Sequence, residues 1–483
     1  MGVRRSVVLS SAANMSALAV QFVLMVVVTR WLSPAEIGAF VVAISIVLIV
    51  EPIRELQLPS FLVKHPTIDR SILSAARFVG LLTSGVALAV CLIGVVITAR
   101  EYESPDVSTC LLIMTLSFLA KPWTQTSLAL LQREMRFGEI AVIRLGGALL
   151  RTVVTLGMLM AGFGTPSLAW GYLVEVLFEG LAIQLHRGPH RFVGPSWRNS
   201  REVWIFCIQF SGAQLLVRIT ASVAPLFVGM FLGLAPAAFY NRANSIVKFF
   251  RSSLEAAILP IALSEFARRN RENTASVRTA YLTSIGTLTG ATWPALIALV
   301  TLAYPLIVTV YGPEWEQSAP ISQVLTIGAM IYAATAMSQQ LFASIGQTRL
   351  LLFRELLLQP PRLIILFVCS QYSILTAATG FVATIAIGFF VSQYFLRKAI
   401  GVRYRDLARA LAKSFAVTVV TGVTTALLIR APFFASESPE WQLFTVGPIG
   451  AAAWLASLWL VRHPLALELR RFATRGRMRA SQA

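Results

Sequence analysis

The sequence has few charged residues and few of the residue types on which most enzyme chemistry depends. Only 13% of its 483 residues are charged, whereas 56% are hydrophobic. No stretch is polar enough and long enough to fold as a separate domain in water. The four cysteines lie in or at the edge of apolar stretches without paired spacing, so neither a disulfide framework nor a metal site is implied. No Walker-type glycine loop is present, which excludes ATP hydrolysis within this chain.

Aspartate and histidine are also scarce. The aspartates lie in predicted loops, so no aspartate is available inside the membrane as a proton or sodium site: Asp69, Asp106 and Asp406. The histidines fall in or beside predicted cytoplasmic loops, where we expect them to be solvated: His65, His186, His190 and His463. No soluble acidic cluster is present that would hold a metal and a sugar nucleotide. We therefore expect a protein that is not an enzyme, with no cofactor and no bound metal.

The hydrophobic residues are gathered into long runs. A helix needs roughly 20 apolar residues to cross a bilayer, and about fourteen runs have this length. The first run is too long for a signal-peptide core, so we expect it to be retained as a helix. The sequence thus predicts an all-α polytopic membrane protein. We place the spans at residues 7–29, 37–58, 74–98, 108–131, 141–162, 166–186, 203–231, 236–262, 281–310, 317–342, 350–370, 374–396, 410–429 and 442–461.

Positive charges alternate between the two sides of this arrangement. Loops after odd-numbered spans hold few arginines, namely Arg30, Arg100 and Arg430. Loops after even-numbered spans are basic throughout, from Lys64 and Arg70 to Arg405 and Arg409. Because short basic loops stay in the cytoplasm, both termini are predicted to be cytoplasmic. The net charge of +19 largely reflects this topology. The basic tail from Arg462 to Arg479 is expected to lie against anionic lipid headgroups rather than nucleic acid.

The chain contains an internal repeat. The segment TRWLSPAEIGAFVVAISIV from Thr29 matches GMFLGLAPAAFYNRANSIV from Gly229 without a gap, at an offset of 200 residues. Because six predicted spans separate the copies, the halves have the same orientation in the membrane, which is a parallel repeat. We expect two six-helix lobes around a central cationic cavity, with two C-terminal helices appended. The predicted parts are 1–202 (spans 1–6), 203–405 (spans 7–12) and 406–483 (spans 13–14 and the tail).

Charges inside the predicted spans are candidates for a functional site. A charge in mid-membrane costs at least roughly 2.5–3.5 kcal/mol on insertion scales, so such residues normally face a cavity or a partner. In span two, Glu51, Arg54 and Glu55 share one helical face, which also includes Leu58. A second group lies on the repeat-related span eight, where Lys248, Arg251 and Glu255 share a face and Arg242 lies nearer the start.

Such a cavity suits an anionic substrate, because guanidinium groups bind phosphate oxygens bidentately. Arg144 and Arg151 in span five and Arg218 in span seven would extend the cationic surface. The alternative is internal pairing, for instance of Arg144 and Arg151 with Glu175 and Glu179 of span six, or between neighbouring charges within spans two and eight.

Several strings resemble those of a known family. They are the turn LSPAEIGAF, LLQREMRFGEIAVIRL from Leu130 to Leu145, FLGLAPAAFYNRANSIVKFF, ILPIALSEFARRN and LFASIGQTRLLLFRELL. These strings, over roughly residues 1 to 400, resemble the Wzx-type polysaccharide flippases of the multidrug/oligosaccharidyl-lipid/polysaccharide (MOP) superfamily. Within it they are most similar to the colanic acid and succinoglycan exporter group, which serves exopolysaccharide and lipopolysaccharide biosynthesis.

The resemblance implies both an activity and a site. It implies a bacterial inner-membrane protein that moves undecaprenyl-pyrophosphate-linked oligosaccharide repeat units to the outer leaflet. Cavity arginines of the superfamily's first, second and eighth spans are implicated in pyrophosphate binding, which points here to Arg54 and Arg251. A first-span arginine deep in the membrane is missing, because Arg30 lies at the outer end of that span. Whether the protein works alone or beside a polysaccharide polymerase and glycosyltransferases is left open.

Two other function classes compete with a flippase. A cation-coupled drug or metabolite antiporter of the same superfamily would need an embedded acidic site in the first lobe, and Glu51 and Glu55 keep this alternative open. A scaffold or polymerase subunit without transport conflicts with the repeat and the embedded charges. Sugar recognition would be spread over polar groups without a readable code, such as Gln21, Gln125, Asn241, Asn244 and Gln339.

Overall fold

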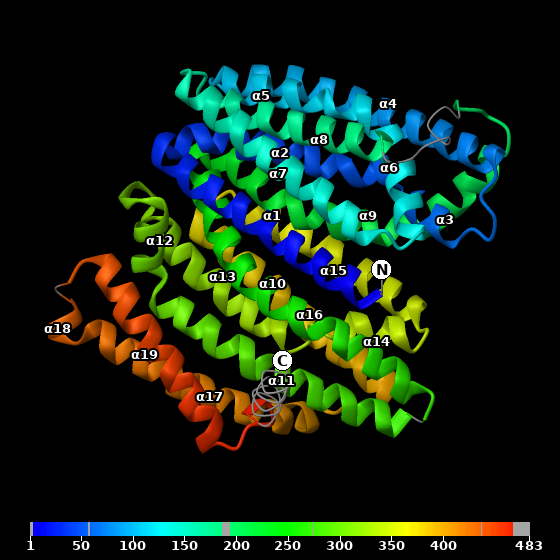
Figure 1. Ribbon diagram of the computed structural model, residues 1–483. Helices are drawn as coiled ribbons and strands as arrows, with labels where there is room; N and C mark the ends of the chain where they lie inside the picture. Colours follow the sequence, from blue (N-terminus) through cyan, green and yellow to red (C-terminus); the bar gives the residue numbers. More distant parts are fainter. Residues whose placement is uncertain (1–2, 57, 186–193, 273, 436, 467–483) are drawn as a thin grey trace, which may run out of the picture. The chain divides into compact units, whose positions relative to one another are not determined.

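The computed structural model describes residues 3–56, 58–185, 194–272, 274–435 and 437–466 of the chain. Over these residues the secondary structure is helical, without a strand (Figure 1). The chain divides into two compact units, Met1–Ala238 and Phe239–Ala483. This confirms the predicted all-α membrane fold.

Unit 1 contains the first nine helices. Helix α2 packs against α4, α5 and α9, and α8 packs against α5, α6 and α7. Since α9 packs on α2, α3 and α4, the compact unit extends past residue 202, where the predicted first part ends. The helices are α1 (Val3–Trp31), α2 (Pro34–Glu55), α3 (Leu58–Lys64), α4 (Arg70–Glu101), α5 (Pro105–Thr115), α6 (Ser117–Arg133), α7 (Phe137–Met160), α8 (Pro166–Leu185) and α9 (Ser200–Leu232).

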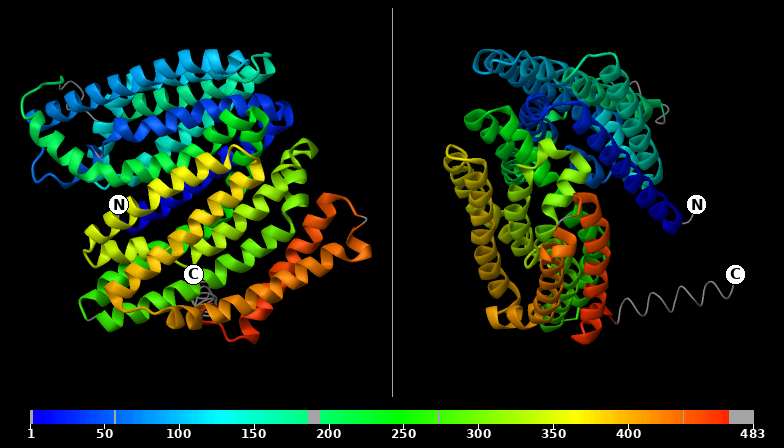
Figure 2. Two further views of the ribbon diagram at one scale, coloured as in Figure 1. Left: turned by 180° about the vertical axis from the view of Figure 1, so that it is seen from behind. Right: turned by 90° about the vertical axis from the view of Figure 1, so that its left-hand side faces the viewer.

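Unit 2 contains most of α10 and all later helices. Helices α17 and α19 pack against each other and against α11, and Figure 2 shows them as a hairpin closed by α18. The helices are α10 (Leu234–Asn270), α11 (Thr274–Thr301), α12 (Ala303–Tyr311), the 3₁₀ turn η2 (Pro313–Trp315), α13 (Ser318–Ala333), α14 (Ser338–Ser344), α15 (Thr348–Cys369), α16 (Ile374–Ile400), α17 (Tyr404–Arg430), α18 (Pro432–Ala435) and α19 (Pro439–Leu460).

The repeat motif identified in the sequence marks the start of a helix in both copies. Ser33 caps α2 in a capping box, in which its backbone N–H donates to Glu36 Oε2 at 2.8 Å and its side chain accepts from the Glu36 N–H. In the second copy Gly233 precedes α10 at φ 101°, a backbone conformation that favours glycine. The two helices begin at Pro34 and Leu234, so the offset of 200 residues holds in the structure.

A second, equivalent turn extends the repeat at a different offset. Helix α6 ends before Met135 (φ 58°), and α14 ends before Gly346 (φ 74°), so the left-handed residues lie 211 positions apart. The hydrogen bonds agree, because Arg136 N donates to Leu131 O and Gln347 N donates to Phe342 O, each at 3.0 Å. Helix pairs also correspond: α4 packs on α5 and α7 on α8 in unit 1, while α11 packs on α13 and α15 on α16 in unit 2.

Eleven helical stretches within the described residues are long and apolar enough to cross a membrane, so the predicted total of about fourteen is not reached by this criterion. The described apolar part of α1, Met15–Trp31, is shorter. Helices α10 and α15 match the predicted spans 236–262 and 350–370 but carry too many charges, among them Arg251 and Arg354. The charges that make these helices functionally interesting thus also make them atypical membrane spans.

Several predicted spans are interrupted. The predicted span 37–58 ends early because α2 stops at Glu55 and Leu56 adopts a left-handed conformation at φ 36°. Leu58 therefore belongs to α3 and does not share the α2 face with Glu51, Arg54 and Glu55, which corrects the prediction. The predicted spans 108–131, 281–310 and 317–342 are each built from two helices, joined at Leu116, Leu302 and residues 334–337.

His463 is a second correction, because it is buried rather than solvated, with 1% of its surface exposed. Leu465 N donates to its Nδ1 at 3.1 Å, which leaves Nε2 to carry the proton and donate to Ser414 Oγ at 3.1 Å. Ser414 Oγ in turn donates to Gly286 O at 3.0 Å. Burial beside Lys413 lowers the pKa of His463 to about 4, so the imidazole is neutral at pH 7. His186, His190 and most of the basic tail lie outside the described residues.

Candidate functional site

The embedded charges of α2 form one connected network within unit 1. Arg54 lies in the last turn of α2, and its Nη2 pairs with a Glu51 oxygen and, at 3.4 Å, with Glu55 Oε1. Glu55 also accepts from Arg218 Nη1 of α9 at 2.8 Å. Thr83 of α4 donates to the Arg54 carbonyl at 2.9 Å, which fixes the end of the helix. The predicted residues of span two and Arg218 of span seven therefore come together.

Arg54 is the most enclosed member of this network. Only 2% of the residue is exposed, whereas the Glu55 and Arg218 side chains are 28% and 50% exposed. Arg54 Nε and Nη1 are buried and have no hydrogen-bond partner among the described residues. A guanidinium group has five donors, and a buried donor without a partner costs free energy. Arg54 thus has two buried donors that no described group uses, next to carboxylates that hold it in place.

Lys121, a further cation of the same network, was not identified from the sequence. Lys121 of α6 is 7% exposed, and its Nζ lies 2.5 Å from Glu51 Oε2 and 3.1 Å from Tyr172 Oη of α8. It also lies over the rings of Phe118 and Tyr172, at 5.0 and 5.6 Å from their centroids. A lysine inside the apolar span 108–131 was the signal that could have revealed it.

Helices α7 and α8 carry a neighbouring set of charges. Arg151 Nη1 donates to Glu175 Oε2 at 2.9 Å, which is the internal pairing considered from the sequence as the alternative to a binding role. Arg144 is exposed and interacts electrostatically with Glu179, which also interacts with Lys121. Gly147 of α7 permits this contact, because a Cβ there would lie 3.2 Å from Glu179 Cγ. Arg151 is therefore an ion-pair partner of Glu175, whereas Arg144 is linked to this group only electrostatically, through Glu179.

In unit 2 the predicted charges of α10 are dispersed. Lys248 is exposed. Arg242 is 9% exposed, and its guanidinium lies 5.6 Å from the Trp315 ring and 6.0 Å from the Tyr311 ring. Arg251 Nε lies 3.8 Å from Glu255 Oε1, and the guanidinium lies 4.6 Å from the Tyr332 ring of α13.

Helix α15 adds charges in unit 2 that were not identified in the sequence. Arg354 Nη1 lies 3.6 Å from Glu355 Oε1, and Gln359 Nε2 donates to Glu355 at 2.7 Å. Arg362 Nε donates to Thr384 Oγ1 at 3.2 Å. Tyr332 of α13 interacts electrostatically with Arg251 and Glu255 of α10. It also interacts with Arg354 and Glu355 of α15, so the three helices share one polar region. The charges of α15 lie within the apolar predicted span 350–370, and this position was the sequence signal that could have revealed them.

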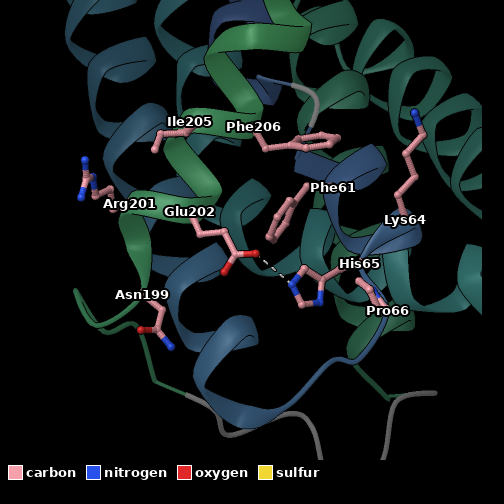
Figure 3. A pocket seen from close by; sticks show the side chains of 9 residues that line it. All are labelled: Phe61, Lys64, His65, Pro66, Asn199, Arg201, Glu202, Ile205 and Phe206. Atoms are coloured by element: carbon pink, nitrogen blue, oxygen red, sulfur yellow. Dashed lines mark hydrogen bonds and ion pairs between the residues drawn. The ribbon is translucent and has the colours of Figure 1, made fainter.

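A separate pocket of about 680 Å³ lies beside α3 and the start of α9 (Figure 3). His65 Nε2 faces Glu202 Oε1 at 3.2 Å, and Lys64 and Arg201 point away from this pair. A carboxylate at its centre makes this pocket a poor match for an anion. None of the predicted site residues lines this pocket. Its lining residues are Phe61, Lys64, His65, Pro66, Asn199, Arg201, Glu202, Ile205 and Phe206.

Proteins of similar sequence include three that are named for the biosynthesis or transport of teichuronic acid, succinoglycan and lipopolysaccharide. The chain is 24% identical over 365 residues to the succinoglycan biosynthesis transport protein ExoT of Rhizobium meliloti (74% of this chain, 72% of the relative). It is 21% identical to the teichuronic acid biosynthesis protein TuaB of Bacillus subtilis (79% and 80% covered). It is also 21% identical to the lipopolysaccharide biosynthesis protein WzxC of Escherichia coli (67% and 66% covered).

Solved structures of the same fold include MOP-superfamily transporters. The lipid II flippase MurJ in an inward closed conformation superposes with a TM-score of 0.76 at 15% identity, covering 94% of this chain and 99% of that chain. An inward-facing multidrug resistance MATE transporter gives a TM-score of 0.57 at 14% identity, covering 82% and 99%. These likenesses establish the fold. The model of the polysaccharide biosynthesis protein family matches residues 27–320, more than half of the chain, so this protein belongs to that family.

Proposed function

We propose that the protein is a flippase that moves undecaprenyl-pyrophosphate-linked oligosaccharide repeat units across the bacterial inner membrane, for synthesis of a cell-surface polysaccharide. The observation that carries the proposal is Arg54, a buried guanidinium with two nitrogens that lack a partner among the described residues. Family membership and relatives named for polysaccharide biosynthesis and transport support it.

The chemistry of the substrate explains why such a group is needed. A diphosphate cannot enter hydrocarbon unless its lost hydration is replaced. Arginine replaces hydration well, because its planar fork binds two phosphate oxygens in parallel. In this proposal Arg54 contacts the pyrophosphate and Arg218 guides it from the exposed edge of the network. Arg251 and Lys248 of α10 contribute further positive charge, and Glu51, Glu55 and Glu255 limit the binding strength so that the substrate can leave.

Transport would follow from alternating access, with the polyprenyl tail remaining in lipid while the charged head crosses. We also propose that both termini are cytoplasmic, from the distribution of lysine and arginine in the loops. A polysaccharide polymerase and glycosyltransferases are partners in this scheme, because a repeat unit must be assembled before it crosses and polymerised afterwards.

The test is a gene deletion followed by mass spectrometry of lipid-linked oligosaccharide. We expect undecaprenyl-pyrophosphate-linked repeat units to accumulate and surface polysaccharide to be lost, both reversed by the wild-type gene. Arg54→Ala is expected to fail in complementation, and Arg54→Lys to complement partly, because a point charge loses the bidentate geometry. Arg100→Ala, an exposed arginine at the end of α4, is the matched control and should complement fully.

The competing hypothesis predicts another result. A cation-coupled drug or metabolite antiporter would leave polysaccharide and lipid-linked precursors unchanged in the deletion strain. Full complementation by Arg54→Ala, at a membrane level equal to wild type, would reject the proposed site. Normal polysaccharide with no accumulated precursor would reject the flippase itself.

A further inference from the structure

Lys121 is a buried cation in unit 1 that the proposed transport cycle does not yet use. It is 7% exposed, and its Nζ directly contacts Glu51 Oε2 at 2.5 Å and Tyr172 Oη at 3.1 Å. Glu179 acts on it electrostatically, without a hydrogen bond in the described structure. Glu51 is therefore the carboxylate that Lys121 touches.

Glu51 is shared between two cations. One of its oxygens pairs with Arg54 Nη2 and the other with Lys121 Nζ. If Lys121 were removed, the buried carboxylate would keep Arg54 as its remaining direct partner. A buried carboxylate with a single counter-ion holds that counter-ion strongly, because breaking the pair leaves the carboxylate uncompensated. Lys121 therefore decides how tightly Glu51 holds Arg54.

The internal repeat supports a specific role for this position. The offset of 211 residues that separates the equivalent turns at Met135 and Gly346 also separates Lys121 from Tyr332. By the offset of 200 residues between α2 and α10, Glu51 and Arg251 occupy equivalent positions of the repeat. In unit 2 these positions also meet, as Arg251 over the Tyr332 ring at 4.6 Å. A contact between these two equivalent positions thus occurs in both units. It is an ion pair in unit 1 and a cation–π contact in unit 2.

We infer that Lys121 is a positioning residue for anion binding, which keeps Glu51 neutralised so that this carboxylate competes less with a substrate phosphate for the Arg54 guanidinium. The inference rests on the proposed function, because it assumes that Arg54 receives the pyrophosphate. Lys121 itself stays bound to Glu51 and Tyr172. It sets the affinity of the site through Glu51 without contacting the substrate.

Binding of undecaprenyl pyrophosphate to the purified full-length protein in detergent tests the inference. Lys121→Met is expected to bind about tenfold more weakly, because Arg54 is then held by an unshared carboxylate. Lys121→Met combined with Glu51→Gln should restore affinity to within about threefold of wild type, and Lys121→Arg should bind like wild type. Lys398→Met, an exposed lysine at the end of α16, is the control.

A purely structural role gives a different pattern. It would lower the melting temperature of Lys121→Met but leave the affinity of the folded protein unchanged. The inference is therefore overturned if Lys121→Met weakens binding by less than about fivefold, or if the double variant binds no better than Lys121→Met. If Lys121→Met does not fold, Glu51→Gln alone should tighten binding by about threefold, and unchanged or weaker binding overturns the inference.

Failure of the inference and failure of the proposed function are distinguishable. If wild type binds undecaprenyl pyrophosphate, Arg54→Ala does not, and Lys121→Met matches wild type, the function stands and the positioning role is rejected. If wild type shows no saturable binding and Arg54→Ala complements fully in cells, both are rejected.

Discussion

Arg54 and Arg151, both on helices of unit 1, differ in how fully their hydrogen-bond donors and charges are satisfied by neighbouring side chains. Arg151 donates to Glu175 at 2.9 Å and both side chains are partly buried, so its charge is balanced by a fixed partner. Arg54 shares its carboxylates with Lys121 and Arg218, and two of its nitrogens have no partner in the described structure. Arg151 Nε also lacks a partner among the described residues, so the two arginines differ in the number of unused donors and in whether their carboxylates are shared with another cation.

Glu175→Gln separates these two roles at the level of one side chain. Losing the partner of a half-buried arginine should lower the free energy of unfolding by about 1–3 kcal/mol. Export per folded molecule should remain at the wild-type level, because Arg54 is unaffected. Thermal unfolding of the purified protein and complementation of the deletion strain, normalised to membrane level, measure the two effects. A specific loss of export at normal stability would contradict the structural assignment.

Arg251 is the corresponding residue of unit 2, held over the Tyr332 ring and near Glu255. We expect Arg251→Ala to reduce export strongly, and Arg251→Lys to retain part of it, because lysine keeps the charge but loses the planar stacking geometry. Accumulation of the lipid-linked oligosaccharide is the measurement. Wild-type polysaccharide in a strain carrying Arg251→Ala would reject a role of Arg251 in export.

At the scale of elements, close helix contacts depend on individual glycines. Gly38 of α2 lies against the start of α10, and a Cβ there would lie 1.9 Å from Leu234 O. Because a backbone atom cannot move aside cheaply, Gly38→Ala should destabilise the protein by about 1–3 kcal/mol. Gly157→Ala in α7 is the control, since nothing lies within 4 Å of its Cβ. Equal melting temperatures for the two variants would show that α2 and α10 tolerate a wider separation.

The buried histidine after α19 predicts a pH-dependent stability. The pKa of His463 is about 4 in the folded protein, below the usual value of 6.5. The unfolded chain therefore binds a proton at His463 more readily than the folded protein does. The contribution of neutral His463 to the free energy of unfolding is fully present above pH 6.5 and is lost as the pH falls toward 4. The melting temperature should drop more between pH 7 and pH 5 for wild type than for His463→Gln, which does not titrate. Parallel curves would exclude His463 as the cause.

At the scale of the whole molecule, the arrangement of basic loops predicts the topology. In a variant without the four native cysteines, Glu103→Cys should react with an impermeant maleimide added to spheroplasts, whereas Asn270→Cys should react only after lysis. Both residues are exposed, so reactivity depends on the side of the membrane. The opposite labelling would invert the topology and place both termini outside the cytoplasm.

Much of the architecture could be predicted because it follows from local patterns. Apolar runs identify helices through their length, and the motif from Leu32 to Glu36 marks the start of α2 through its capping residues. The helix break at Leu116 was not predicted, since an apolar run continues through it, and the break at Leu56 lies two residues before the predicted end of span two. The match at an offset of 200 residues located the repeat, and its second offset of 211 became visible only in the hydrogen bonds of the turns.

The sequence by itself determined that this chain is a helical membrane protein with charges on α2 and α10, because transfer of apolar surface and of charge into lipid depends on residue type alone. Tertiary structure decided which charges meet. It joined Glu51 to Lys121, 70 residues away, and Glu55 to Arg218, 163 residues away, and it left two Arg54 nitrogens without a partner among the described residues. Contacts between helices far apart in the sequence depend on the angles at which the helices cross and on close approaches such as that at Gly38. The periodic pattern of apolar residues along a single helix does not specify either of these.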